Sequence, residues 1–218
     1  MSSIPAPVPD TPADPRYGPE AADLARGIRS RAEQAEPEIT QMMVGIARLN
    51  GATMEQLDQR LKSTDSLTRK IHDTADSMFG GDLNRAAQAV DDAVRYTMVV
   101  GDGVYVGTLQ HIINMFESNK YTLFNKNYWL PGDPYDGMNT KLTKDGVTAE
   151  LQMLTPESRE AKEQTHGYYE RHRDPQNPVV ARKQAWDAMM AIAAKTPRPE
   201  AYQTLLDIGS LELEKPNW

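Results

Sequence analysis

The sequence predicts an α+β fold, in which a small mixed or antiparallel sheet is flanked by helices. Apolar residues recur at helical spacing from about Glu20 to Asp91, a β-rich run follows at residues 93–100, and helical spacing returns after Thr155. With 218 residues, of which 39% are hydrophobic, the chain is long enough for one compact domain with a core.

The composition excludes several classes of function. The chain has no cysteine, which excludes disulfides, thiolate catalysis and cysteine-ligated metals. Its net charge of −7 argues against a non-specific nucleic-acid binder. No apolar run reaches the roughly 18 residues that a membrane span needs, so no membrane partner is expected. The histidines show no metal-ligand spacing, so we expect no zinc site.

Three segments are expected along the chain. Residues 1–19 contain six prolines and almost no large apolar side chains, which indicates a flexible proline-rich arm. The alternative is a linker or delivery segment of a larger modular protein. Residues 20–210 are predicted to form a single domain, and residues 211–218 a tail.

Caps and turn residues divide the domain into elements. Helices are expected at residues 20–33, from Pro37 to Asn50, at 53–61, from Ser66 to Gly80, and at 86–91, 104–117, 156–172 and 179–195. Extended segments are expected at residues 94–100, 121–129, 140–143 and 147–154, with a loop at 131–134. The last two strands should form a hairpin around an Asp145-Gly146 turn.

A basic string, RLKSTDSLTRK, spans residues 60–70. Ser66 and Lys70 are four positions apart, so they share one face of a helix that begins near Ser66. The free N–H groups and positive dipole end of such a helix, together with Lys and Arg side chains, suit a polyphosphate. The alternative is a solvated helix face, in which Asp58 and Asp65 pair with the basic side chains.

A second group lies on the last predicted strand. Glu150 and Gln152 are two positions apart and therefore face the same side, opposite an apolar face. Glu150 becomes a candidate magnesium ligand if a second carboxylate lies close, because Mg²⁺ takes one or two carboxylates plus phosphates and water. Asp91 or Asp92, just before the first strand, can supply that partner. The alternatives are a solvated glutamate and an ion pair of an aspartate with Arg95.

A third group is the segment KNYWLPGDPYDGMN, residues 126–139, which combines a cation with aromatic and turn residues. Its aromatic side chains, Tyr128, Trp129 and Tyr135, could stack on a nucleobase. The alternative is that they are packing anchors.

Taken in order, these strings resemble the synthetase domain of the RelA/SpoT family, which makes guanosine alarmones. RLKSTDSLTRK is similar to the family's Arg-x-Lys…Ser…Lys string, DDAVRYTMVV to its Asp-bearing strand and KNYW to its Lys-Asp-Tyr turn. YDGMN takes the place of its Tyr-x-Ser-x-His motif, and AELQMLT matches its Glu-x-Gln strand. The resemblance covers about residues 53–173 and extends to the toxin domains of this family. It implies the nucleotidyltransferase-like fold of these synthetases.

The resemblance also implies roles for the matching residues. Those implied to hold the adenine and phosphates of ATP are Arg60, Lys62, Ser66 and Lys70. The implied magnesium ligands are Asp92 and Glu150, which together with Lys70 are the implied catalytic residues. Those implied to contact the acceptor are Lys126, Tyr135, Asn139 and Gln152.

This chain departs from the family pattern mainly in the acceptor segment. Gly137 stands in place of the Ser, Asn139 in place of the His, and Pro131 in place of a Lys. The family's Asp lies five positions before Arg95, where this chain has Val90. The acceptor is therefore left open among GDP or GTP, ADP or ATP, and the 3′ end of tRNA.

The predicted function is transfer of the terminal pyrophosphate of ATP to a 3′-hydroxyl with Mg²⁺, by a bacterial toxin or effector. An immunity or antitoxin protein is a candidate partner, and the oligomeric state is open. The expected place of action is the cytoplasm of the producing cell or, after delivery, of the target cell. The main alternative is a catalytically silent nucleotide- or partner-binding module on the same fold. An ADP-ribosyltransferase-like toxin has less support, because the basic string suits ATP.

Overall fold

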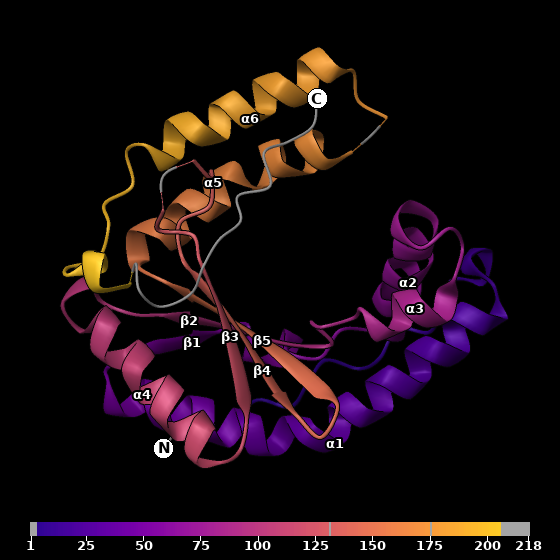
Figure 1. Ribbon diagram of the computed structural model, residues 1–218, viewed down its shortest axis with the longest axis horizontal. Coiled ribbons are helices and arrows are strands. Elements are labelled where there is room, and N and C mark those ends of the chain that lie inside the picture. The colour runs from indigo at the N-terminus through magenta and orange to yellow at the C-terminus, as the bar shows by residue number, and fades with distance from the viewer. Residues whose placement is uncertain (1–3, 131, 175, 206–218) are drawn as a thin grey trace.

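The computed structural model describes residues 4–130, 132–174 and 176–205. At its centre is a five-stranded sheet with the order β1-β2-β5-β4-β3 (Figure 1). The strands are β1 (Thr53–Glu55), β2 (Val94–Val99), β3 (Thr122–Asn127), β4 (Met138–Lys144) and β5 (Val147–Leu154). β2 and β5 are parallel, and the other neighbours are antiparallel. The predicted α+β class with a small mixed sheet is confirmed.

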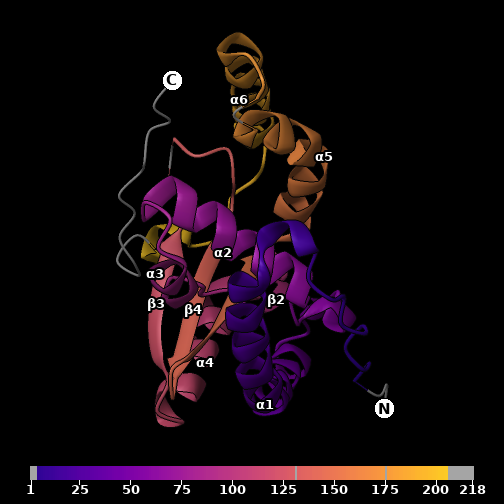
Figure 2. The same cartoon turned by 90° about the vertical axis from the view of Figure 1, so that its right-hand side faces the viewer.

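Helices lie on both sides of this sheet, but only one of its faces is covered by them (Figures 1 and 2). They are α1 (Pro19–Leu49), α2 (Thr64–Met78), α3 (Leu83–Gln88), α4 (Tyr105–Ser118), α5 (Pro156–Arg173) and α6 (Val179–Ala193). α1 and α4 cover one face, and α2 and α3 pack together beside α1. α5 and α6 form a hairpin on the other side of the sheet. No described helix is both long and apolar enough to cross a membrane.

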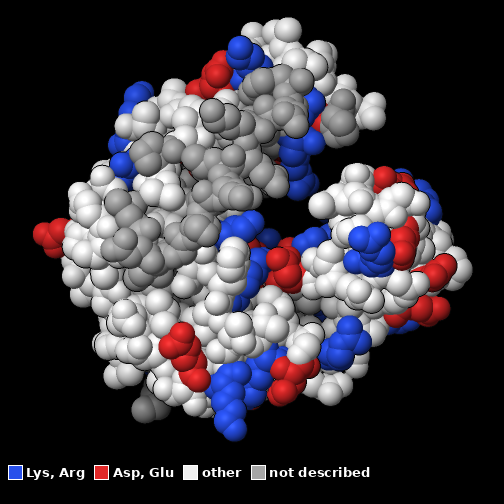
Figure 3. Space-filling model, viewed as in Figure 1, with Lys and Arg blue, Asp and Glu red and all other residues white. Residues whose placement is uncertain are grey.

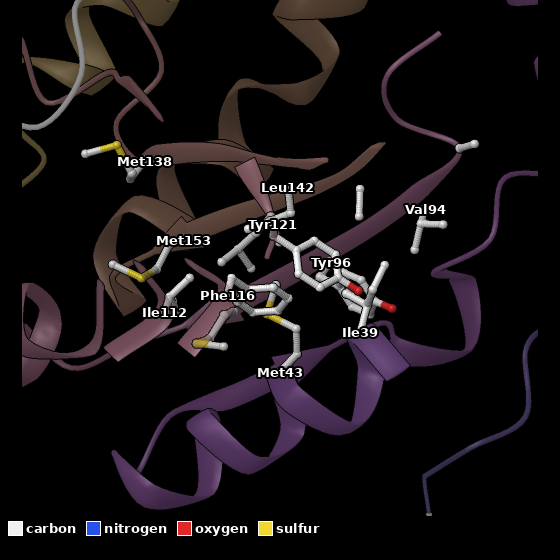
Figure 4. Packing of buried hydrophobic residues seen from close by; sticks show 14 of the residues in the cluster. Ile39, Met43, Val94, Tyr96, Ile112, Phe116, Tyr121, Met138, Leu142 and Met153 are labelled. Atoms are coloured by element: carbon white, nitrogen blue, oxygen red, sulfur yellow. The ribbon is translucent and has the colours of Figure 1, made fainter. Parts of the chain in front are cut away.

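The hydrophobic core lies between α1, α4 and the sheet face that they cover (Figure 4). Alternate residues of β2 are fully buried there, and Tyr96 lies close to Ile39 and Met43 of α1. The intervening residues of β2 are exposed or half-buried. Because side chains alternate across a strand, the second face of the sheet is left free to carry polar groups.

α1 is one helix that runs through Pro37, whereas the sequence predicts two helices. An interior proline costs about 3 kcal/mol relative to alanine. Here Pro37 is exposed, while Ala32 before it and Ile39 and Met43 after it belong to the same core. Burial of one continuous apolar face therefore outweighs the local cost.

Residues 53–61 form β1 and a 3₁₀ turn, Leu57–Gln59, where the sequence predicts a helix. β1 pairs with the end of β2, from Thr53 opposite Val99 to Glu55 opposite Thr97. This pairing is a long-range contact that local spacing does not reveal. The other predicted helices and strands are present with their ends shifted by a few residues. Pro131 of the predicted loop and the predicted tail, 211–218, lie outside the described residues.

The predicted arm is attached to the domain over the part that the structure describes. Before the 3₁₀ turn Pro15–Tyr17 it has no helix or strand, as its prolines predict. The Asp10 carboxylate accepts hydrogen bonds from the Thr64 amide (2.7 Å) and hydroxyl (2.6 Å) at the first residue of α2. The Asp65 amide donates to the Thr11 carbonyl (3.0 Å). The free N–H groups at the start of a helix need acceptors, and the arm supplies them.

A buried ion pair lies under the arm. The guanidinium of Arg60 is 5% exposed and pairs with the buried Glu36 of α1, which also accepts from Thr40. We expect Glu36→Ala to lower the free energy of unfolding by about 3–5 kcal/mol, because it leaves a buried guanidinium unpaired. Urea denaturation measures this loss.

Glu38→Ala on the same helix is the matched control. The carboxylate of Glu38 pairs with Lys144 at 2.8 Å but is half exposed, so its loss should cost about 1 kcal/mol or less. Equal small losses in the two variants would show that water reaches Arg60.

Candidate functional site

Four strands bring polar residues to the free face of the sheet. Residues directly opposite one another in neighbouring strands share a face. One row across the sheet is Arg95, Glu150, Lys141 and Phe124, and the next is Thr97, Gln152, Asn139 and Lys126. Figure 3 shows a hollow between the α2–α3 side and the α5–α6 side, with acidic and basic side chains together at its floor.

Two lysines of the basic string converge on one aspartate. Lys70 Nζ lies 2.7 Å from Asp92 Oδ1, and Lys62 Nζ bonds Oδ2 of the same carboxylate. Burial alone would raise the pKa of Asp92, but the two ammonium groups outweigh it and lower the pKa to about 2. Burial lowers the pKa of Lys62, against the opposing effect of Asp92. Asp92 therefore holds the two predicted phosphate-binding lysines together.

Glu150 is joined to Asp91 through a lysine that the sequence analysis missed. Lys141 Nζ lies 3.3 Å from Glu150 Oε1 and 3.1 Å from Asp91 Oδ2. Lys70 Nζ lies 3.6 Å from the other oxygen of Asp91. Asp91 is thus the carboxylate that shares a cation with Glu150. Asp92, the ligand implied by the family resemblance, pairs through both of its oxygens with lysines.

The acceptor residues predicted from the resemblance continue this network. The carboxamide of Asn139 lies 3.5 Å from Glu150 Oε1, and its oxygen accepts from the Tyr135 hydroxyl (2.9 Å). Tyr135 packs edge-on against Tyr128, with ring centroids 5.1 Å apart. A Cβ at Gly137 would come within 2.9 Å of the Tyr135 hydroxyl and of a Leu154 methyl group, so any other residue would require these side chains to shift. The two departures at 137 and 139 therefore belong to one arrangement of Tyr135.

The second row contains Gln152 and Lys126. Lys162 of α5 donates to Gln152 Oε1 at 2.6 Å, and burial lowers the pKa of Lys162, with a further contribution from Arg95. Lys126 is exposed on β3, directly opposite Asn139. The structure thus brings these two predicted residues to the same face as Glu150.

Two predictions in the basic string have different outcomes in the structure. Ser66 lies in the first turn of α2. Its amide donates a hydrogen bond to the Ser63 hydroxyl oxygen at 3.2 Å, and the Ser63 hydroxyl donates one to the Ser66 hydroxyl oxygen at 3.1 Å. Arg60 lies apart from the lysines, because it is buried with Glu36 and donates to the Pro5 carbonyl at 2.9 Å. Its predicted stacking on adenine stays a prediction that requires this contact to open.

Among the aromatic residues of the third group, Trp129 is a packing anchor. It is fully buried, and its indole N–H donates to the Tyr105 hydroxyl at 3.1 Å. A separate cavity of about 390 Å³ lies under the arm and includes none of the predicted site residues. Its lining is Pro7, Val8, Pro9, Asp10, Arg29, Glu33, Glu36 and Leu61.

A sequence signal for Lys141 exists, while none exists for Lys162. The two-residue Asp145-Gly146 turn has both φ angles positive, at 51° and 74°, and pairs Lys144 with Val147. Counting back along the hairpin from that pair places Lys141 opposite Glu150. The contact of Lys162 depends on the tilt of α5, which no local pattern specifies.

The segment between β3 and β4 holds two carboxyls, Asp133 and Asp136, whose pKa values are raised by burial. Burial raises the pKa of Asp136 to about 6, although Arg198 opposes it. One of its oxygens is buried with no hydrogen-bond partner among the described residues. A raised folded-state pKa means that the carboxyl favours folding when protonated and opposes it as the pH rises from about 4 through 6.

Asp136→Asn should therefore match the parent in stability near pH 4. The shift from 3.8 to about 6 corresponds to about 3 kcal/mol, and solvent screening of this half-buried carboxyl reduces the expected gain at pH 7 to 8 to about 2 kcal/mol. Urea titrations across this range measure the difference. A variant that is less stable than the parent at pH 8 would show that the carboxylate has a favourable partner.

The fold was compared with known proteins. No protein-family model matches the chain, and no curated protein is significantly similar in sequence. A chain in the crystal structure of the complex between the type VI effector Tas1 and its immunity protein matches with a TM-score of 0.52 at 19% identity. The match covers 79% of this chain and 97% of that chain.

Small alarmone synthetase 1 from Bacillus subtilis matches as well. Its structure bound to the product pppGpp has a TM-score of 0.50 at 17% identity, over 74% of this chain and 87% of the other. Another of its structures has a TM-score of 0.51 at 16% identity, over 79% and 92%. Identities this low establish the fold alone. The predicted resemblance is confirmed at that level: this chain has the fold of the RelA/SpoT-type small alarmone synthetases.

Proposed function

We propose that the chain transfers the terminal pyrophosphate of ATP to a 3′-hydroxyl of a nucleotide or of tRNA, with Mg²⁺. The observation that carries the proposal is one unbroken polar network on the free face of the sheet. From the lysines predicted to hold ATP to the residues predicted to contact the acceptor, its members are Lys62, Asp92, Lys70, Asp91, Lys141, Glu150, Asn139 and Tyr135.

Lys62 and Lys70 suit the donor phosphates. Lys62 precedes α2 and Lys70 lies within it, and Asp92 holds their ammonium groups close together. Triphosphate oxygens can replace the Asp92 carboxylate as the partner of either lysine, because both present negative oxygens to the same ammonium groups. We therefore assign Asp92 the role of gathering the donor-binding cations.

The carboxylates fit the chemistry of magnesium. Mg²⁺ takes one or two carboxylates and completes its shell with phosphates and water. Glu150 and Asp91 already converge on one cation, the Lys141 ammonium, and Asp92 is the next residue along the chain. No group of three or more acidic or histidine side chains among the described residues could hold a metal. Nucleotide phosphates would complete the ligand set, and the bound ion would neutralise charge on them.

The proposed reaction is a displacement at phosphorus. The acceptor 3′-oxygen forms a bond to the β-phosphorus of ATP, while the bond from that phosphorus to the α,β-bridging oxygen breaks and AMP leaves with the electron pair. Glu150, which is 8% exposed and lies between donor and acceptor residues, accepts the proton of the 3′-hydroxyl. Such transfers depend mainly on alignment and charge neutralisation, which the lysines supply.

The proposal includes a role as a toxin or effector and a neutralising protein partner. Its support is the likeness in fold to a chain from an effector–immunity complex. The acceptor stays open among GDP or GTP, ADP or ATP, and tRNA. Tyr135 is hydrogen-bonded to Asn139 and its hydroxyl lies close to Gly137, which supports an acceptor pocket shaped differently from that of the family pattern.

The first test incubates the protein with Mg²⁺, γ-labelled ATP and each acceptor separately. We expect label in one acceptor together with released AMP. Lys70→Ala and Glu150→Gln should each lower the rate by at least about a hundredfold, because each removes a group that acts on the transferred phosphates or the proton. Chromatography of the products measures both effects.

Lys144→Ala and Glu38→Gln are matched controls, because they alter an ion pair outside the network. Both should retain the parent rate, and expression of the two site variants should lose any toxicity that the parent shows. Folded parent protein that binds ATP yet labels no acceptor would favour the catalytically silent module instead.

A further inference from the structure

Lys141 has an environment unlike that of a surface lysine. Its ammonium lies within 3.4 Å of three oxygens: Glu150 Oε1, Asp91 Oδ2 and the Asp91 carbonyl. Its side chain is 17% exposed. Lys144, on the same strand, instead pairs with a single half-exposed carboxylate. Lys141 is thus a semi-buried cation held between two carboxylates of different elements.

Both carboxylates pair with this cation. The Glu150 side chain is 11% exposed and that of Asp91 is 49% exposed, and each has an oxygen within 3.3 Å of the Lys141 ammonium, whose positive charge offsets their mutual repulsion. The hairpin register places Lys141 directly opposite Glu150, while Asp91 reaches it from the segment before β2. The ammonium therefore occupies the position between carboxylates that a divalent cation would take.

The charges of the network sum to zero without a ligand. Its carboxylates are those of Asp91, Asp92 and Glu150, and its ammonium groups are those of Lys62, Lys70 and Lys141. A nucleoside triphosphate with one divalent cation brings a net negative charge. If that cation binds the carboxylates, the ammonium between them is released and can pair with the incoming phosphates.

We infer that Lys141 is the internal counter-ion of the site: it holds Asp91 and Glu150 in place and exchanges with the divalent cation that accompanies the nucleotide. The inference deepens the proposed function and rests on it for the identity of the cation. It makes Lys141 a positioning residue, because it acts on the reaction through the two carboxylates. It also pairs Glu150 with Asp91, one of the two partners considered from the sequence, where the family resemblance implies Asp92.

The test measures binding of Mn²⁺ alone to the nucleotide-free protein, by electron paramagnetic resonance and calorimetry. Lys141→Met keeps the length of the side chain and removes its charge, so the cation no longer competes with an ammonium. We expect Lys141→Met to bind Mn²⁺ about tenfold more tightly than the parent. Without metal, we expect Lys141→Met to melt at a lower temperature than the parent. Added Mn²⁺ should raise the melting temperature of the variant by more than it raises that of the parent.

Two further variants separate charge from packing. Lys141→Arg keeps the positive charge and should bind Mn²⁺ like the parent, and Lys144→Met should have no effect. The inference would be overturned if Lys141→Met bound Mn²⁺ no more tightly than the parent. It would also be overturned if Lys141→Arg, which keeps the charge, bound Mn²⁺ more tightly than the parent. Absence of measurable Mn²⁺ binding to both the parent and Lys141→Met would also overturn it.

The measurement needs neither nucleotide nor turnover. A chain that exchanges Lys141 for Mn²⁺ but transfers no pyrophosphate would contradict the proposed function alone. Near-ultraviolet circular dichroism of Lys141→Met checks that the variant is folded, and Lys141→Arg still tests the effect of charge if it is not.

Discussion

The parallel pairing of β2 with β5 is the constraint on which the site depends. It places β5 between β2 and β4, so that Glu150 lies between Arg95 on one side and Lys141 on the other. A carboxylate as buried as Glu150 is costly unless cations or donors surround it. The register supplies them, and the same register leaves the opposite face of these strands mainly apolar for α1 and α4.

Sequence reasoning succeeded where the deciding interaction is local. The Asp145-Gly146 turn, the alternation of β5 and the Thr155 cap of α5 each involve residues a few positions apart. These local rules were enough to place Glu150 and Gln152 on one face and to start a helix before Lys70. The aromatic composition of residues 126–139 pointed to Tyr135, and the family resemblance added Asn139, which no periodicity identifies.

The two elements that were predicted wrongly, and the unexpected position of Arg60, depend on distant contacts. Pro37 does not divide α1, because burial along the whole helix outweighs one missing hydrogen bond. Residues 53–55 form a strand only because the end of β2 offers an edge. Arg60 belongs to the basic string in sequence, yet its position is set by Glu36, which lies twenty-four residues earlier. In each case the competing interaction comes from another element, which single-sequence patterns do not contain.

The α5–α6 hairpin is attached to the sheet mainly through β5, at one of its ends. It is fixed at its base, where Thr155 caps α5 at the end of β5 and where buried Leu205, after α6, accepts a hydrogen bond from Asn127 at 2.8 Å. Toward its tip the two helices are joined to each other by a hydrogen bond of 2.9 Å, which Arg182 Nε of α6 donates to the His172 carbonyl of α5. The bond between Lys162 and Gln152 joins α5 to the floor of the hollow, so a group that took Gln152 from Lys162 would remove one of the contacts that hold the hairpin in place.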